Sequence, residues 1–281
     1  MKIKILPAYT QLPAYFSALT DGVPMEQAWQ ETMLAPYWDT LCQYAPMDLQ
    51  TRKPRPIPDT PALRAQAAML DALSLSNLQE EFTNIVQALP KDDTDPVYVA
   101  LYPGNAEDES LRIRHNGVNG VSLFGNVLLR INPLAPDYMP WLTYVFAHEY
   151  HHSAWGYYHY ILHTEQTDAD FLTALLIDGE ADSFARTLYP QLRPQWLFSL
   201  PQDGIRALWH TKYAELAQRT DVDYETYMFG STDAGIPWCA GYAVGYALVQ
   251  DFLYKNPQVD MPALLKLPPQ QILEQSGWKI L

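Results

Sequence analysis

The string His148-Glu149-Tyr150-His151-His152 constrains this chain more than any other stretch of its sequence. Histidines four residues apart project from one face of an α-helix, so the side chains of His148 and His152 can reach the same zinc ion. Glu149 lies about 100° round that helix, where it can accept a proton from a water molecule activated by the metal. His151 points to a different side of the helix and is the least suitable ligand.

The residues before this string predict the helix that the string requires. Asp137 can serve as the N-cap, and Pro140 falls in the first turn. Apolar side chains then recur at spacings of three and four residues, as an amphipathic helix demands: Trp141, Leu142, Val145 and Phe146. This context favours a zinc site over a chance occurrence of the five-residue pattern.

Composition limits the class of protein to which such a site can belong. The 281 residues are 48% hydrophobic, enough for a sizeable core, and no apolar run is long enough to cross a bilayer or to act as a signal peptide. We therefore expect a cytoplasmic protein without a membrane partner. The net charge of −14 repels phosphate backbones, so we expect no nucleic-acid partner.

Cys42 and Cys239 are too isolated for a disulfide framework or a thiolate metal site.

The first third of the chain predicts helices. Residues 26–34 and 76–89 have amphipathic spacing, and Ser76 or Asn77 can open the second of these helices. Between them, residues 51–61 contain four prolines, which preclude a regular helix and predict an extended connector.

Strand character follows. Residues 96–103 are β-branched and aromatic, and residues 120–133 contain two apolar runs joined at Gly125-Asn126, a dipeptide that can close a hairpin. We expect a small antiparallel sheet directly before the His148 helix. An edge strand of that sheet can pair with an extended peptide, or the strands can simply cover the core.

A second helix is predicted to supply the third ligand that a catalytic zinc ion needs. The helical pattern of residues 168–190 contains the acids Asp178, Glu180 and Asp182, which are costly in so apolar a helix unless they are paired or bound to metal. Asp178 and Asp182 share one face, whereas Glu180 lies about 200° away. Small residues nearby, such as Gly179, are expected to let this helix lie close to the His148 helix.

Three segments resemble a bacterial family of predicted zinc-dependent proteases related to the gluzincins. The segments are H-E-Y-H-H, D-G-E-A-D-S-F-A-R-T-L-Y-P and I-P-W-C-A-G-Y-A-V-G-Y-A-L-V-Q, and the resemblance spans roughly residues 97–255. Gluzincins carry a glutamate as the third ligand on a later helix, in an E-x-x-A-D setting. The resemblance places that ligand at Asp178, where this chain has the shorter acid, and the following acid at Asp182.

Other residues remain candidates for the third ligand. Glu180, two residues after Asp178, can reach the metal if its side chain turns toward it. The string from His148 to His159 also approaches the metzincin pattern, with one residue too many before Gly156 and His159. His159 and His163 are more typical of surface or hydrogen-bonded histidines. If Asp178 is the ligand, we expect Asp182 to accept a hydrogen bond from a ligating histidine or to pair with Arg186.

Tyr242 and Tyr246 lie one turn apart in the third resembling segment. A neutral phenol can donate a hydrogen bond to the oxyanion that develops during peptide hydrolysis. Tyrosines at this spacing are also ordinary core residues, and His210 is a weaker candidate for the same role. The glycines at 241 and 245 predict close helix packing.

These inferences combine into one hypothesis. We expect a mostly helical α+β protein with a zincin-like arrangement: a helical region over residues 1–95 and a metallopeptidase region over 96–281, separate or in one continuous domain. His148, His152 and Asp178 would bind Zn²⁺, and Glu149 would act as general base on a peptide or protein substrate. The alternatives are a zinc hydrolase acting on a non-peptide amide or ester, and an inactive regulatory or binding module.

Overall fold

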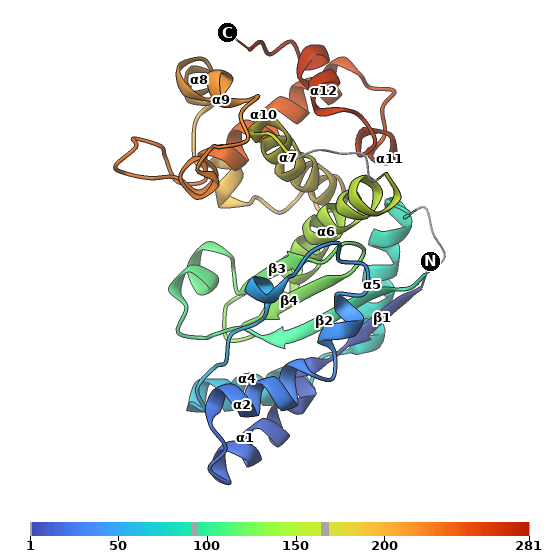
Figure 1. Ribbon diagram of the computed structural model, residues 1–281, viewed down its shortest axis with the longest axis vertical. Helices are drawn as coiled ribbons and strands as arrows, with labels where there is room; N and C mark the ends of the chain where they lie inside the picture. Colours follow the sequence, from blue (N-terminus) through green and yellow to red (C-terminus); the bar gives the residue numbers. More distant parts are fainter. Residues whose placement is uncertain (1, 92–94, 164–168, 281) are drawn as a thin grey trace. The chain divides into compact units, whose positions relative to one another are not determined.

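The computed structural model describes residues 2–91, 95–163 and 169–280, and its contacts divide the chain into two compact units, Met1–Ile161 and Leu162–Leu281 (Figure 1). The chain is mostly helical with one small sheet, as the sequence predicted for an α+β protein. The boundary expected at residues 95/96 falls inside the first unit and stays a prediction. In the described part of the chain, no helix is long and apolar enough to cross a membrane.

A four-stranded mixed sheet forms the centre of the first unit, in the order β1-β2-β4-β3. Its strands are β1 (Ile3–Leu6), β2 (Val97–Pro103), β3 (Val118–Ser122) and β4 (Val127–Ile131). β2 pairs in parallel with both β1 and β4, and only β3 and β4 are antiparallel. The expectation of an antiparallel sheet was therefore wrong. β2 lies in the interior of the sheet and is buried on both faces, as parallel strands usually are.

The hairpin between β3 and β4 turns one residue earlier than predicted. Leu123 and Asn126 are bonded to each other through their backbones, so the two central residues are Phe124 and Gly125. Both have positive φ angles, 48° and 103°, as the tight turn of a two-residue hairpin requires. Asn126 is instead a fixed part of the sheet, because its side chain accepts a hydrogen bond from the backbone N–H of Tyr98 at 2.9 Å.

The helices of the first unit are α1 (Leu12–Thr20), α2 (Met25–Trp29), α3 (Trp38–Leu41), α4 (Pro61–Asp71), α5 (Leu75–Ala88) and α6 (Tyr138–Gly156). α6 packs on β3 and β4 while α5 packs on β1 and α6, and α3 and α4 pack against β2. The predicted position of the sheet beside the His148 helix is thus confirmed.

Local sequence signals explain where two of these helices begin. α5 starts at Leu75, one to two residues earlier than predicted, because the hydroxyl of Ser74 accepts a hydrogen bond from the backbone N–H of Asn77. The proline-rich connector lies between helices as expected, and Thr60 at its end caps α4.

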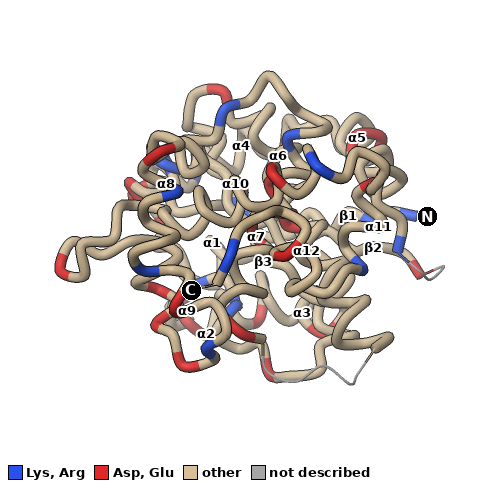
Figure 2. The backbone as a smooth tube through the Cα atoms, turned by 90° about the horizontal axis from the view of Figure 1, so that it is seen from above, with Lys and Arg blue, Asp and Glu red and all other residues tan. Residues whose placement is uncertain are grey.

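The second unit is helical. Its helices are α7 (Phe171–Leu188), α8 (Gln202–Leu208), α9 (Ala214–Leu216), α10 (Ala240–Lys255), α11 (Met261–Leu264) and α12 (Pro269–Ser276). α10 runs through its core and packs along α7, α8 and α12 (Figure 1). Basic residues are scattered among the more numerous acidic ones along the backbone of the whole chain (Figure 2).

α7 and α10 make their closest approach at Gly179 and Gly245. A Cβ atom added at Gly245 would overlap the carbonyl oxygen of Leu175, and one added at Gly179 would overlap the backbone of Gly245. The prediction of close packing at Gly245 is confirmed. Gly179, which was expected to serve contact with the His148 helix, is used here for contact with α10.

Replacing Gly245 by alanine is expected to destabilise the protein. The new methyl group meets backbone atoms that cannot rotate away, so the free energy of unfolding should fall by about 3 kcal/mol, the upper end of overpacking effects. Urea denaturation measures the change. The matched control is Gly204→Ala in α8, where the nearest atoms are side-chain atoms of Pro201 at 3.5 Å. That variant should be as stable as the wild type or more stable by up to about 1 kcal/mol. Equal stability of both variants would contradict the packing argument.

Candidate metal centre

The helix α6 brings His148 and His152 together on one face. Their Nε2 atoms are 2.9 Å apart, and their rings meet edge to face with centroids 4.5 Å apart. Asp137 occupies the predicted N-cap position in the left-handed region, at φ 57°, without a capping bond from its side chain. The first two members of the predicted site are therefore adjacent and half-buried.

Two further histidines near this pair lie inside the first unit. His151 is fully buried, and its burial, reinforced by the neighbouring His152 and His148, lowers its pKa well below the ordinary value, so it is neutral. His159 is also buried, with its ring 4.1 Å from that of Trp155 between centroids. His163 is exposed.

Glu149 lies against the edge strand β3. A Cβ atom added at Gly120 would overlap the side chain of Glu149, with Cδ at 3.0 Å, so a larger residue at this position would displace that side chain. Burial lowers the pKa of the Arg130 guanidinium on β4, and the charge of Glu149 opposes that shift. The strand thus fixes the space in which the Glu149 carboxylate can lie.

Asp178 lies on α7 in the second unit and is only 5% exposed. The hydroxyl of Tyr224 donates a hydrogen bond to its Oδ2 at 3.3 Å. The ring of Phe229 contacts the rings of Tyr224 and Tyr242, at 5.9 and 5.6 Å between centroids. These three aromatic side chains form one group, and Tyr224 is the member that bonds to the carboxylate.

The two neighbouring acids of α7 lie in different surroundings. Glu180 is 2% exposed, and burial raises its pKa well above the ordinary value. Asp182 is fully buried and accepts a hydrogen bond from the indole N–H of Trp196, at 3.1 and 3.3 Å to its two oxygens. Arg186 donates to the backbone carbonyl of Leu192 at 3.0 Å. The expected bonds of Asp182 to a ligating histidine or to Arg186 stay predictions.

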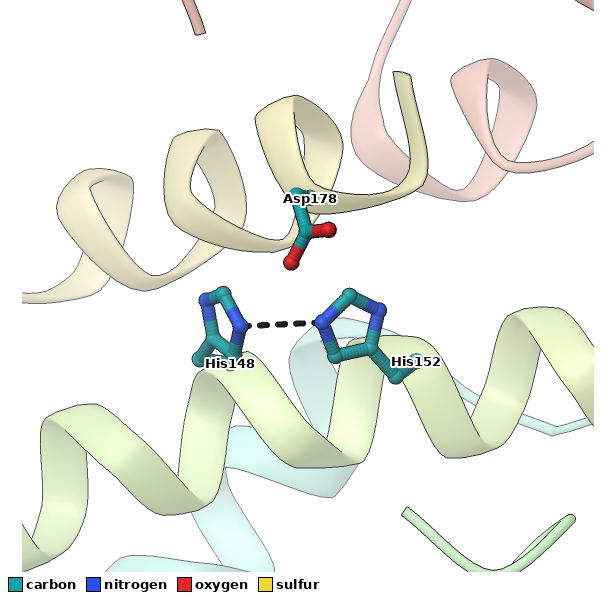
Figure 3. Close-up of side chains that lie close together, drawn as sticks. All are labelled: His148, His152 and Asp178. Carbon is teal, nitrogen blue, oxygen red and sulfur yellow. Dashed lines mark hydrogen bonds between the residues drawn. The ribbon is translucent and has the colours of Figure 1, made fainter. Parts of the chain in front are cut away.

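One group of side chains in the described residues has the composition of a metal site. A ring nitrogen of His148, one of His152 and a carboxylate oxygen of Asp178 lie within 4.8 Å of one another. Figure 3 shows the carboxylate of Asp178 pointing toward the two rings. Glu180 and His159, the alternatives considered from the sequence, are not members of this group.

Tyr242 and Tyr246 lie on α10 in different environments. Burial, followed by the charge of Asp178, raises the pKa of Tyr242 well above its ordinary value. Burial also raises the pKa of Tyr246, against the opposing effect of Arg186, whose guanidinium lies 5.9 Å from the tyrosine ring centre. Both phenols are protonated at neutral pH and can donate a hydrogen bond, and Tyr242 is the one beside Asp178.

The sequence matches the family described as "Predicted Zn-dependent protease (DUF2268)" over residues 75–274. The chain belongs to this family. An uncharacterized protein of Bacillus subtilis strain 168, YjfC, is 28% identical over 187 residues, which cover 63% of this chain and 60% of YjfC. The chain thus spans three fifths of the length of that relative. No solved structure matches this chain.

Family membership confirms the resemblance stated from the sequence, and the matched region contains His148, Glu149, His152 and Asp178. Sequence reasoning did not find Tyr224, Trp196 or Gly120. Tyr224 and Trp196 lie in short helical segments that carry no recognisable motif. Gly120 stands inside a strand, where a glycine often marks a close approach of other atoms, and that signal could have drawn attention to it.

Tyr224→Phe is expected to weaken zinc binding about tenfold, because it removes the hydrogen bond that orients Asp178 while keeping the aromatic ring. Competition with a chromophoric chelator measures the affinity. Tyr254→Phe is the control, since Tyr254 is 87% exposed and should bind zinc as the wild type does. Equal affinities for the two variants would remove Tyr224 from any role in holding the carboxylate.

Proposed function

We propose that this protein is a zinc-dependent peptidase in which His148, His152 and Asp178 hold the ion. The observation that carries the proposal is the grouping of two imidazole nitrogens and one carboxylate oxygen within 4.8 Å, in a chain whose family is described as predicted Zn-dependent proteases. Three protein ligands are the usual number for catalytic zinc, and a structural ion would have four.

The donor atoms fit zinc in type and in spacing. Nitrogen and oxygen ligands at about 2.0–2.2 Å in a tetrahedral arrangement are separated from one another by about 3.4 Å. The Nε2 atoms of His148 and His152 are 2.9 Å apart and need to separate only slightly. When bound, zinc supplies Lewis acidity, which lowers the pKa of water and polarises a carbonyl group.

Glu149 is the general base in this proposal. It is one residue from His148, it does not belong to the ligand group, and its carboxylate is confined by Gly120. Its role is to accept a proton from the attacking water and to transfer that proton to the amine that leaves. Tyr242 and Tyr246 are the proposed donors to the developing oxyanion, and the position of Tyr242 beside Asp178 favours Tyr242.

A peptide or protein substrate is supported by the position of β3. This strand is at one end of the sheet order among the described strands, and an edge strand can pair with an added strand. Gly120 on this strand is the residue that contacts Glu149. An extended peptide paired with β3 would therefore pass close to the proposed base.

The metal assignment is tested by zinc content after purification without chelators. We expect one zinc ion per chain in the wild type and none in His148→Ala. Asp178→Ala should weaken the affinity by orders of magnitude, Asp182→Ala by about 10- to 100-fold, and Glu180→Ala very little. A wild-type protein without metal would refute the proposed function, and a Glu180→Ala variant that alone loses zinc would transfer the third ligand to Glu180.

Asp178→Glu tests how the carboxylate is placed. The longer side chain should weaken binding if the packing of α7 is matched to aspartate, and should strengthen binding if the packing suits the glutamate that gluzincins carry. The same chelator competition measures the change. Wild-type affinity in Asp178→Glu together with wild-type affinity in Asp178→Ala would exclude this position as a ligand.

The role of Glu149 is tested by two variants that should both retain zinc. Glu149→Gln is expected to lower the rate of peptide hydrolysis by several powers of ten, because the general base is lost. Gly120→Ala is expected to lower it by about 100-fold, because the methyl group displaces the carboxylate by about 1 Å. Cleavage of a fluorescence-quenched peptide library gives the rates, and Gly204→Ala is the control for a glycine replacement. Undiminished turnover by Glu149→Gln would refute the mechanism.

A further inference from the structure

The second unit contains a pocket of about 440 Å³ whose lining does not include the proposed metal ligands. It lies between α10 on one side and the segment of residues 193–205 on the other. Its apolar wall includes Leu197, Ala243 and Ala247. All of its lining residues belong to Leu162–Leu281.

Three polar groups at this pocket have hydrogen-bonding capacity that the described residues do not use. The hydroxyl of Ser199 is buried and has no hydrogen-bond partner in the described part of the chain. Gln250 donates from Nε2 to the hydroxyl of Ser183 at 2.9 Å, which leaves its Oε1 to accept a hydrogen bond. A buried hydroxyl without a partner is costly, so a ligand that satisfies it gains affinity.

The third group is the guanidinium of Arg193. Its Cζ atom lies 4.4 Å from the ring centre of Phe198, and this contact helps to hold the side chain at the pocket. Among the described residues it has no carboxylate partner within ion-pair distance. Arginine is suited to bind a carboxylate through two parallel N–H groups.

The acid of the pocket does not oppose an anionic ligand. Asp251 already accepts hydrogen bonds from Arg206 and from the indole N–H of Trp278, the latter at 2.7 Å. Its charge is therefore compensated within the protein. The pocket offers donors at Arg193 and Ser199, an acceptor at Gln250, and an apolar wall.

We propose that this pocket binds the C-terminal residue of a peptide. The carboxylate would accept hydrogen bonds from Arg193 and Ser199, the amide N–H would donate to Oε1 of Gln250, and an apolar side chain would pack against Leu197 and Ala243. Tyr246, a proposed oxyanion donor, also lines the pocket. The inference does not depend on zinc, because every group that recognises the ligand comes from the protein.

The test compares N-acetyl-leucine with N-acetyl-leucinamide, which differs only in lacking the carboxylate. Titration calorimetry of the full chain should show N-acetyl-leucine binding with a roughly millimolar Kd, as expected for a ligand of this size. The amide should bind at least tenfold more weakly. The same titration with His148→Ala separates this pocket from the metal centre, and the affinity should be unchanged.

Variants identify the groups that bind. Arg193→Gln should weaken binding of N-acetyl-leucine tenfold or more. Arg219→Gln, which removes an exposed arginine paired with Asp221 at 2.8 Å, is the control and should bind as the wild type does. Ser199→Ala should weaken binding while leaving Tm unchanged or raised by about 2 °C, because it removes an unsatisfied hydroxyl. A merely structural hydroxyl would instead lower Tm.

Four results would overturn the proposal. They are equal binding of the acid and the amide, binding of neither at concentrations well above the expected Kd, loss of binding in His148→Ala, and unchanged affinity in Arg193→Gln. The third result would place the ligand at the metal centre and leave the zinc proposal intact. Conversely, a protein without zinc that still binds N-acetyl-leucine would refute the proposed peptidase and retain this pocket.

Discussion

The close packing of α7 against α10 determines where the acids of the second unit lie. The backbones of two helices can touch only where neither helix has a side chain at the contact. Gly179 on α7 and Gly245 on α10 meet this requirement. Asp178 directly precedes Gly179, and Glu180 directly follows it. The glycine contact therefore sets the rotation of α7, and with it the direction in which each of the buried carboxyl groups points.

Three acids within five residues of α7 consequently lie in three different surroundings. Asp178 accepts a hydrogen bond from the phenol of Tyr224 and belongs to the group with the imidazole nitrogens of His148 and His152. Glu180 is buried, which raises its pKa, and Asp182 accepts a hydrogen bond from an indole N–H. A metal binds the deprotonated form of a carboxyl group, so a raised pKa weakens its binding. The burial of Glu180 thus favours Asp178 as the proposed ligand.

Much of the first unit could be predicted from the sequence, because its signals are local. The spacing of His148 and His152, the start of α6 and the strand character of residues 97–103 each depend on a few consecutive residues. The parallel pairing of β1 with β2 was not predicted, since β1 has only four residues and its partner is distant in the chain. The predicted turn of the hairpin was wrong by one residue. Gly125-Asn126 is a dipeptide typical of turns, but the buried side chain of Asn126 accepts a hydrogen bond from Tyr98 and so belongs to the sheet.

The sheet also has a consequence for how the chain folds. β1 pairs with β2 in a register that joins Ile3 to Val97, so β1 can form this pairing only after α1 to α5 have been synthesised. At translation rates of about 5–20 residues per second, that interval is roughly 5–20 seconds. During it, α3 and α4 lack β2, the strand against which they pack. The first unit therefore needs a pairing that is remote in the chain, and such pairings form more slowly than local contacts.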